Sequence, residues 1–520
     1  MAALLLVVVM LSGVCQAQQK TEPPVMGMYV HEHWPYNHPY AARTWTLEDW
    51  RGYADGLHRL GFNTIMIWPM VGIMPDPPTS SDLAALHKTA QVIDMLHKDF
   101  GMRVVLVLGA NVVPKDEVAR KAAFEKRHFY YTENFINPAD PAAVADLMRR
   151  REKSLRFLKA ADAFAIIDSD PGGYPNSSNS EFINLLKQYR KLFDKLRPGI
   201  ELIYWVHVGW PGYGRWYATG KFGWSTPEEY EQAVTMASQA GLAPWGLAGA
   251  RRGVLLEPKW QPLSIAFNYG VIEHEPSFPL TNFEGNASYE GGKGGLPRGV
   301  MGNAENHCLQ LPNTFAFARG ATGKSLTDAD FAQFANDLLP GQGKKVVAAW
   351  KAIAGDDPAE MRKNAEIMES LSEGKLSTGP LGGLLFGSPQ RFLDDLSKQL
   401  DVKAAYEDFL SAQKAAKNVG PALGKFVAAS EIWQKKTGYE NYWGFPGMTD
   451  ALRKLNVPEI NHVLAEQGPF GNGTEPFGAN PGATPYERIE NGFANVETYT
   501  PQLLRAMKKA VTELNKTGSE

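Results

Sequence analysis

Two carboxylates stand at the end of an apolar run in the sequence. Residues 163–167 are Ala-Phe-Ala-Ile-Ile, and Asp168, Ser169 and Asp170 follow directly, before a Pro-Gly-Gly turn. Carboxylates held this close together in a partly desolvated place repel each other, so one can stay protonated as an acid while the other remains charged. The pattern predicts acid/base catalysis by at least one of them. The alternative is that Asp168 or Asp170 caps the turn or pairs with an arginine.

A second group of polar residues begins at His31. It continues with Glu32, His33 and Trp34, and the two histidines project to the same side of an extended chain. That spacing suits hydrogen bonds to sugar hydroxyl groups, which we favour, or chelation of a metal ion. Together with His207, the His-x-His pattern is similar to the amidohydrolase family of metal-dependent barrels. Aspartates stand here where that family commonly carries a bridging lysine, so we expect no metal and no other cofactor.

Aromatic residues recur at or just after the ends of the apolar runs. Flat rings with a polar edge are platforms for sugars, which are apolar on one face and hydroxylated at the edge. The side chains expected to bind substrate come from these rings, from polar residues at the same positions and from one aromatic C-terminal loop. They are His31, His33, Trp34, Trp68, Asn111, Tyr174, Trp205, His207, Trp210 and Trp443.

Alternating strands and helices explain where these residues stand. The apolar runs are residues 25–30, 63–69, 103–110, 163–170 and 201–209, with amphipathic stretches between them. This alternation is typical of βα units around a parallel sheet, and runs that are apolar on both faces favour a closed (β/α)8 barrel over an open sheet. The polar residues then lie at the carboxyl ends of the strands, where such barrels build their active sites.

The sequence does not decide which segments form the last three strands of the barrel. Four runs compete for them, at residues 244–249, 253–258, 264–275 and 299–307. The glycine-rich stretch 285–302 predicts either a mobile loop over the barrel mouth or a surface insertion.

After residue 322 the composition shifts to Ala, Lys, Asp, Glu and Leu with helical periodicity. The sequence therefore predicts a signal peptide at 1–17, a barrel at 18–322 and an α-helical C-terminal domain at 323–520. Loops at 438–447 and 468–488 are too rich in Gly, Pro and aromatic residues for a helical bundle. We expect them either to wall the substrate cleft, through a residue such as Trp443, or to pack between the two domains.

The first seventeen residues predict export from the cytoplasm. Residues 4–11 are apolar but too few to span a bilayer, and Ala17 offers a signal-peptidase site. We expect a secreted or periplasmic protein, and lipidation at Cys15 is disfavoured because Val14 is not small. The rest of the chain has no stretch apolar enough to cross a membrane. A net charge of −3 gives no positive potential that would attract nucleic acid. The sequence does not indicate the oligomeric state.

These features together resemble a (β/α)8-barrel glycoside hydrolase. The segment IIDSDPGG, at 166–173, resembles the acidic pair on the fourth strand of hexosaminidase-type and O-GlcNAcase-type barrels, although Ser169 separates the pair here. In those barrels the pair serves substrate-assisted hydrolysis. The α-glucuronidase barrels also carry helical C-terminal domains. The resemblance implies a secreted glycosidase whose substrate is a glycan or oligosaccharide.

Such a reaction needs a second carboxylate. We expect Asp170 to donate a proton to the leaving-group oxygen and Asp168 to orient or polarise the reacting group. The second carboxylate is expected in the later strands, at Glu273 or Glu305, with Glu275 as a further candidate.

The same residues are compatible with two other functions. A glycan-binding barrel that had lost catalysis would keep the same aromatic mouth, and only the ionisation of its aspartates would separate it from an enzyme. A metal-dependent hydrolase would use His31, His33 and His207, with converging ligands and an open position for water.

Overall fold

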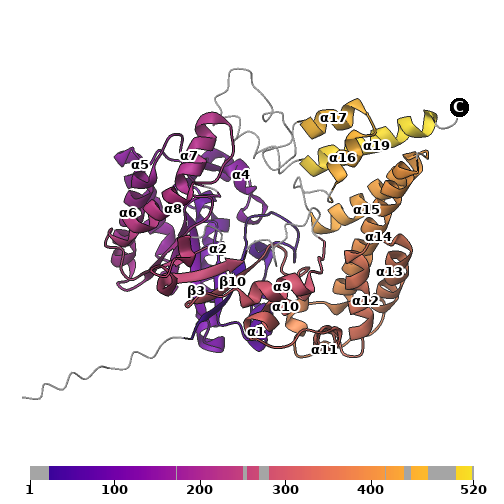
Figure 1. The fold of residues 1–520 in the computed structure, drawn as a ribbon, viewed down its shortest axis with the longest axis horizontal. Coiled ribbons are helices and arrows are strands. Elements are labelled where there is room, and N and C mark those ends of the chain that lie inside the picture. Colours follow the sequence, from indigo (N-terminus) through magenta and orange to yellow (C-terminus); the bar gives the residue numbers. More distant parts are fainter. Residues whose placement is uncertain are drawn as a thin grey trace, which may run out of the picture.

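The computed structural model of the chain consists of a closed barrel followed by a group of helices (Figure 1). It describes residues 23–170, 172–249, 254–268, 280–415, 417–438, 445, 447–465 and 499–517. The predicted signal peptide, Glu273, Glu275 and Trp443 lie outside the described residues.

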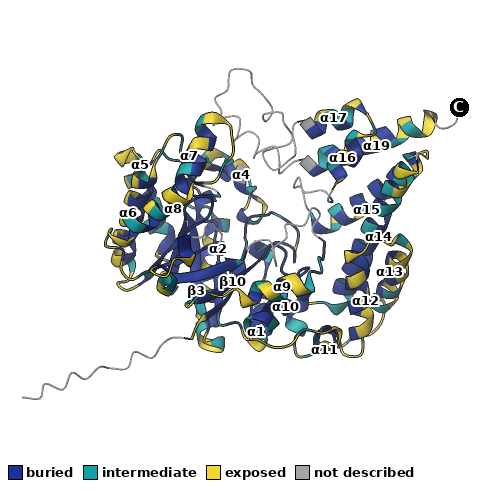
Figure 2. Ribbon diagram, in the orientation of Figure 1, coloured by how far each residue is buried: buried dark blue, intermediate teal, exposed yellow. Residues whose placement is uncertain are grey.

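Eight parallel strands form the barrel, which confirms the predicted fold class. They are β1 (Val25–Val30), β2 (Thr64–Ile67), β3 (Arg103–Gly109), β6 (Ala163–Ile167), β7 (Glu201–Trp205), β8 (Trp245–Ala248), β9 (Ser264–Asn268) and β10 (Gly299–Ala304). Around the ring the order is β1-β10-β9-β8-β7-β6-β3-β2. The strands are buried at nearly every position (Figure 2), because side chains fill the barrel and helices cover its outside.

Three of the four competing runs supply the last strands. They become β8, β9 and β10, while the run 253–258 contains a 3-10 helix at Val254–Leu256. That run ends in Pro258, which has no N–H to donate to a strand ladder. The apolar content of the run therefore reflects burial of a turn against the barrel.

The glycine-rich stretch 285–302 is not the loop that the sequence predicted. It forms α9 (Gly285–Lys293) and most of β10, and α9 packs on α10 (Leu311–Ala321). A Cβ on Gly292 would stand 2.1 Å from a backbone oxygen of α10, and one on Gly320 would stand 1.8 Å from a backbone oxygen of α9. The two glycines thus permit close approach of the helices.

Helices cover the outside of the barrel between successive strands. The main ones are α1 (Leu47–Leu60), α2 (Ser80–Phe100), α5 (Pro141–Leu155), α6 (Asn179–Leu196), α7 (Trp210–Thr219) and α8 (Pro227–Ser238). Capping boxes at Thr46, Thr79, Ser178 and Thr226 begin four of them by satisfying the first backbone N–H groups. A short antiparallel pair, β4 (Val112–Pro114) and β5 (Glu133–Phe135), follows β3.

The described part of the chain after β10 contains helices and no strand, as predicted. These C-terminal helices are α11 (Asp328–Leu338), α12 (Gly343–Ala354), α13 (Pro358–Ser372), α14 (Pro389–Lys414), α15 (Gly420–Thr437), α16 (Met448–Arg453), α17 (Pro458–Ala465) and α19 (Tyr499–Thr517). They lie to one side of the barrel (Figure 1). Within the described ranges, no helix has both the length and the apolarity needed to cross a membrane.

The C-terminal helices are fastened to the loop that follows β1. The backbone N–H of Asn37 donates to the carbonyl oxygen of Thr437 at 2.7 Å, and its side-chain amide donates to that of Lys436 at 3.2 Å. The rings of Tyr40 and Trp433 meet edge to face, with centroids 5.7 Å apart. Because this loop starts at the carboxyl end of β1, the end of α15 lies beside the barrel mouth, the rim formed by the carboxyl ends of the strands.

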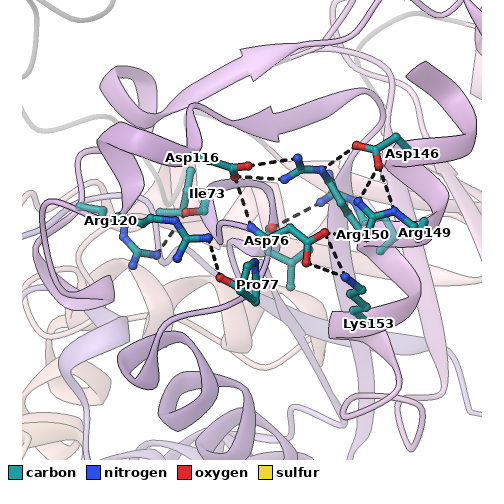
Figure 3. A network of polar contacts seen from close by, with 12 residues as sticks. Ile73, Asp76, Pro77, Asp116, Arg120, Asp146, Arg149, Arg150 and Lys153 are labelled. Atoms are coloured by element: carbon teal, nitrogen blue, oxygen red, sulfur yellow. Dashed lines mark hydrogen bonds and ion pairs between the residues drawn. The ribbon is translucent and has the colours of Figure 1, made fainter. Parts of the chain in front are cut away.

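A network of ion pairs joins three segments on the barrel's outer wall (Figure 3). Asp76, in the loop after β2, accepts hydrogen bonds from Arg149 at 2.6 Å and from Lys153 at 2.7 Å, both in α5. Arg150 of the same helix pairs with Asp116, the first residue of α3 (Asp116–Ala119), at 3.0 Å. The hydrogen bond from Lys153, with further contributions from Arg149, holds the pKa of Asp76 below its usual range.

Replacement of Asp76 by Asn should weaken this network. Because the native pKa is lowered, the stabilisation is present above the ordinary carboxyl pKa and is lost as the pH falls through the lowered value. We expect Asp76→Asn to cost about 1 kcal/mol of unfolding free energy at pH 7, and the cost to shrink in acid. Urea unfolding at pH 7 and at about pH 2 measures both values.

Asp94→Asn is the matched control. Asp94 makes an exposed ion pair with Lys98 one turn along α2, and removal of such a pair should change stability little. A cost for Asp76→Asn that is independent of pH would contradict the role given to its charge.

Candidate active site

Polar side chains gather at the mouth from strands on opposite sides of the ring. His31 follows β1 and Glu305 follows β10, and these two strands are neighbours. Asp170 follows β6 and His207 follows β7, also neighbours, which lie across the ring from the first pair. The mouth therefore has a carboxylate and a histidine on each of two opposing sides.

Three aromatic rings close the barrel below these residues. Trp205 stacks on Phe267 with centroids 4.5 Å apart, and Tyr29 meets Trp205 edge to face at 5.1 Å. All three are buried. They come from β7, β9 and β1, alternate strands of the ring, as in the side-chain layers that fill such barrels. This aromatic floor contains the predicted Trp205, and His31 lies above it, 4.2 Å from Tyr29.

Hydrogen bonds fix the orientation of His31 and His33. Nε2 of His31 lies 2.7 Å from Oδ1 of Asn303, and the Nδ1 atoms of the two histidines lie 3.0 Å apart. Because an amide oxygen only accepts, Nε2 of His31 carries the proton and Nδ1 accepts from His33. Burial lowers the pKa of His31 to about 4, and burial with the nearby His31 and Arg43 lowers that of His33 well below its usual value. Both imidazoles are therefore neutral at pH 7.

His207 stands apart in strand order from the other two candidate metal ligands, His31 and His33. His207 stands across the ring from the other two, with its Nδ1 3.7 Å from Oδ2 of Asp170. No group of three or more His, Cys, Asp or Glu residues able to hold a metal ion occurs in the part of the chain that the structure describes. A zinc site needs three or four converging ligands, and the described residues offer no such group for the metal-dependent hydrolase alternative.

Glu305 is held beside the histidine pair. The indole N–H of Trp34 donates to Oε2 of Glu305 at 3.3 Å, and Oε1 lies 3.9 Å from Nδ1 of His31. Trp34 is buried, so its contact with Glu305 orients the carboxylate and its ring offers little open surface to a sugar.

Asp168 is buried at the tip of β6 among hydrogen-bond donors. The hydroxyl of Ser169 donates to it at 2.6 Å and that of Tyr204 at 3.2 Å. The backbone N–H groups of His207 and Gly209 each donate at 3.2 Å. Burial raises the pKa of Asp168 to about 6, against the lowering effect of these hydrogen bonds. The carboxylate thus fixes the loop after β7.

Asp170 differs from Asp168 in its access to solvent. Its side chain is 36% exposed, whereas Asp168 is fully buried. The hydroxyl of Tyr213 donates to Oδ1 of Asp170 at 3.3 Å. Its backbone has a φ of 66°, a left-handed conformation that is uncommon outside glycine and that persists where the surroundings enforce it. The two aspartates therefore have separate environments, one for positioning and one open to a ligand.

Two predicted substrate-binding residues contact protein instead. The amide of Asn111 donates to the carbonyl oxygens of Gly173 at 2.8 Å and Ile136 at 2.9 Å, and the side chain is fully buried. Trp210 is also fully buried and stacks on Phe182 of α6 with centroids 5.2 Å apart. Both predictions were wrong in placing these side chains at the mouth, because Asn111 braces two loops and Trp210 fills the space behind the strands.

Trp68 and Tyr174 remain near the mouth. The ring of Trp68 meets that of His33 edge to face at 4.6 Å, and Phe129, in α4 (Phe129–Thr132), meets the same imidazole at 4.9 Å. Tyr174 packs against side chains of α7 and the β4–β5 pair.

Asn303, Phe129 and Tyr213 contact the site's side chains but were not predicted from the sequence. Asn303 lies inside an apolar strand, where one polar residue gives a weak signal. Phe129 lies in the short helix α4, within the long segment between β3 and β6, and Tyr213 lies on a helix three residues beyond Trp210. Only their contacts with His31, His33 and Asp170 identify them.

The chain is similar to solved structures of other proteins. No protein-family model and no curated protein matches the chain. A GH138 enzyme targeting pectin rhamnogalacturonan II is 8% identical with a TM-score of 0.47, over 79% of this chain and 62% of that one. The GH20 beta-N-acetylhexosaminidase from Streptomyces coelicolor A3(2) is 11% identical with a TM-score of 0.33, over 56% of this chain and 63% of that one.

An old yellow enzyme homologue from Zymomonas mobilis is 15% identical with a TM-score of 0.30, over 46% of this chain and 76% of that one. This chain thus spans less than two thirds of each of the two glycoside hydrolases. Glycoside hydrolases are among these structural neighbours.

The lowered pKa of His31 predicts a loss of stability in acid. The unfolded imidazole takes up a proton near pH 6.5, whereas the buried one does so near pH 4. Stability from this group is therefore present above pH 6.5 and is lost as the pH falls towards 4. His31→Gln keeps a donor for Asn303 and an acceptor for His33 but has no group that titrates in this range. The melting temperature of this variant should therefore fall less than that of the wild type between pH 6.5 and pH 4.

The raised pKa of Asp168 has the opposite effect, because its contribution to stability is lost as the pH rises towards 6. Wild type and His31→Gln both contain Asp168, so this contribution cancels when their melting temperatures are compared. His58→Gln, at an exposed position of α1, is the control and should follow the wild type. Equal pH dependence of His31→Gln and wild type in scanning calorimetry would show that His31 titrates normally.

Proposed function

We propose that the protein hydrolyses glycosidic bonds by carboxylate acid/base catalysis. The observation that carries this proposal is the position of Asp170 and Glu305, which follow strands on opposing sides of the ring above an aromatic floor. Glycosidases of both stereochemical classes use two carboxyl groups that flank the scissile bond. A sugar bound at the mouth, above the buried floor, would have one carboxyl group on each side.

Asp170 donates the proton to the leaving-group oxygen in this proposal. It is the accessible member of the β6 pair, and Tyr213 and His207 hold it at the mouth. Asp168 is a positioning residue, since its carboxylate fixes the backbone of His207 and Gly209 and is itself buried.

Glu305 is the second carboxylate, which either activates water or attacks the anomeric carbon. The hydrogen bond from Trp34 orients it, and the neutral His31 beside it adds no positive charge. Asn303 and His33 engage both ring nitrogens of His31, so Nε2 of His33 is the nitrogen of the pair that could accept from a sugar hydroxyl group. Glu273 is the other candidate from the sequence and lies outside the described residues.

The proposal includes a location outside the cytoplasm. Its support is the apolar stretch 4–11 and the small residue Ala17 that follows it. A secreted or periplasmic enzyme would meet glycans as its substrates.

Substitution of either carboxylate should abolish most turnover. A panel of 4-nitrophenyl glycosides and soluble polysaccharides first identifies a substrate of the wild type. On that substrate we expect Asp170→Asn and Glu305→Gln each to lower kcat by about 10²- to 10⁴-fold, the usual contribution of a general acid or base. Glu152→Gln, on the outer face of α5, is the control and should keep wild-type kcat.

Full turnover by Asp170→Asn would remove Asp170 as the acid. Binding of a polysaccharide without hydrolysis of any member of the panel would favour the glycan-binding barrel over the enzyme.

A further inference from the structure

Two exposed aromatic rings lie next to the candidate active site. Phe222 is 51% exposed and Trp224 is 40% exposed, in the segment between α7 and α8. Their ring centroids are 5.5 Å apart. Trp224 also meets the ring of His207 edge to face at 6.1 Å, and His207 lies 3.7 Å from Asp170. The pair of rings, here called the platform, therefore continues outward from the proposed acid.

The backbone that carries the platform is fixed by hydrogen bonds. Arg215 of α7 donates to the carbonyl oxygen of Trp224 at 3.2 Å. The N–H of Ser225 donates to the carbonyl oxygen of Val208 at 3.0 Å, and its hydroxyl accepts from the N–H of Gly212 at 2.9 Å. A ligand that binds the platform therefore meets a surface that is already ordered, which lowers the entropy cost of binding.

Buried aromatic residues support Phe222 from below. Its ring meets that of Trp216 edge to face at 5.1 Å, and Trp216 is buried. Trp216 belongs to a small hydrophobic cluster separate from the main core, formed by Val112, Phe135, Val208, Tyr213, Trp216 and Tyr217. Tyr213 of this cluster donates to Asp170, so one cluster positions both the proposed acid and the platform.

The chemistry of the platform fits sugar rings. Two adjacent exposed aromatic side chains offer contiguous apolar surface, and burial of that surface by a ligand is favourable. A stable protein interface buries about 800 Å² on each partner, far more than two side chains provide. The platform is continuous with a site already proposed to act on glycans, and sugars present an apolar face to aromatic rings.

We propose that Phe222 and Trp224 bind sugar units of the glycan chain on the leaving-group side of the scissile bond. A general acid stands next to the leaving oxygen, so rings that extend from Asp170 face the part of the chain that leaves. The substrate is then an oligosaccharide or polysaccharide rather than a small glycoside. This inference rests on the proposed function for its direction, while binding of glycan by the platform is measurable without catalysis.

Affinity electrophoresis tests the platform directly. Glu305→Gln protein is run through gels that contain barley β-glucan, arabinoxylan, galactomannan or polygalacturonate, so that the polymers stay intact. We expect at least one polymer to retard it, and Phe222→Ala with Trp224→Ala in the same protein to weaken that binding about tenfold or more. Phe222→Leu with Trp224→Leu keeps apolar side chains without flat rings and should lose binding to a similar extent.

Ile432→Ala is the control, since Ile432 is 57% exposed on α15 and lies outside the platform. It should bind like its parent. No retardation by any of the four polymers would overturn the inference, as would unchanged binding in the platform variants. Retardation that depends on the platform, without hydrolysis by the wild type, would reject the proposed function and keep the binding site. If the wild type hydrolyses a glycan and the platform variants are retarded as strongly as their parent, the platform is rejected and the proposed function stands.

Discussion

Closure of eight parallel strands into one ring is the constraint on which the rest of the structure depends. Parallel strands place all their carboxyl ends on one rim, so residues far apart in the chain become neighbours there. The hydrogen bond between Trp34 and Glu305 spans 271 positions of sequence, and its existence requires that β10 pairs with β1. If the sheet stayed open, these two strands would be its opposite edges and the site would have no second side.

Environment gives the two aspartates of the β6 tip different chemistry. Asp168 receives four hydrogen bonds without solvent contact, while Asp170, two residues later, reaches solvent. The intervening Ser169 contributes to this separation, since its hydroxyl donates to Asp168 and accepts from the backbone of Val208. A directly adjacent pair would project to opposite sides of an extended strand. With one residue between them, the left-handed backbone of Asp170 is what parts the two side chains.

The sequence was sufficient to predict the barrel and most of the residues at its rim, because both depend on local pattern. Runs apolar on both faces predict buried strands, and the first polar residue after each run then falls on the rim. The sequence could not predict the direction of the Trp210 side chain. A residue after a strand can point into the mouth or behind the strands, and the packing of Trp210 on Phe182 decides between the two. The His-x-His spacing correctly predicted that two imidazoles share a side, but a third metal ligand depends on tertiary structure, and no group of three such ligands occurs among the described residues.

The C-terminal helices are more than an appended domain, because they contact the segment that carries the histidine pair. Asn37 follows Trp34 by three residues, and its backbone and side chain both donate to carbonyl oxygens at the end of α15. Both acceptors lie in the last turn of α15, where backbone carbonyl groups run out of N–H donors further along the helix. The same contact shortens the free length of the loop between β1 and α1. The position of Trp34, and through it the orientation of Glu305, therefore depends on helices that contribute no catalytic side chain to the described site.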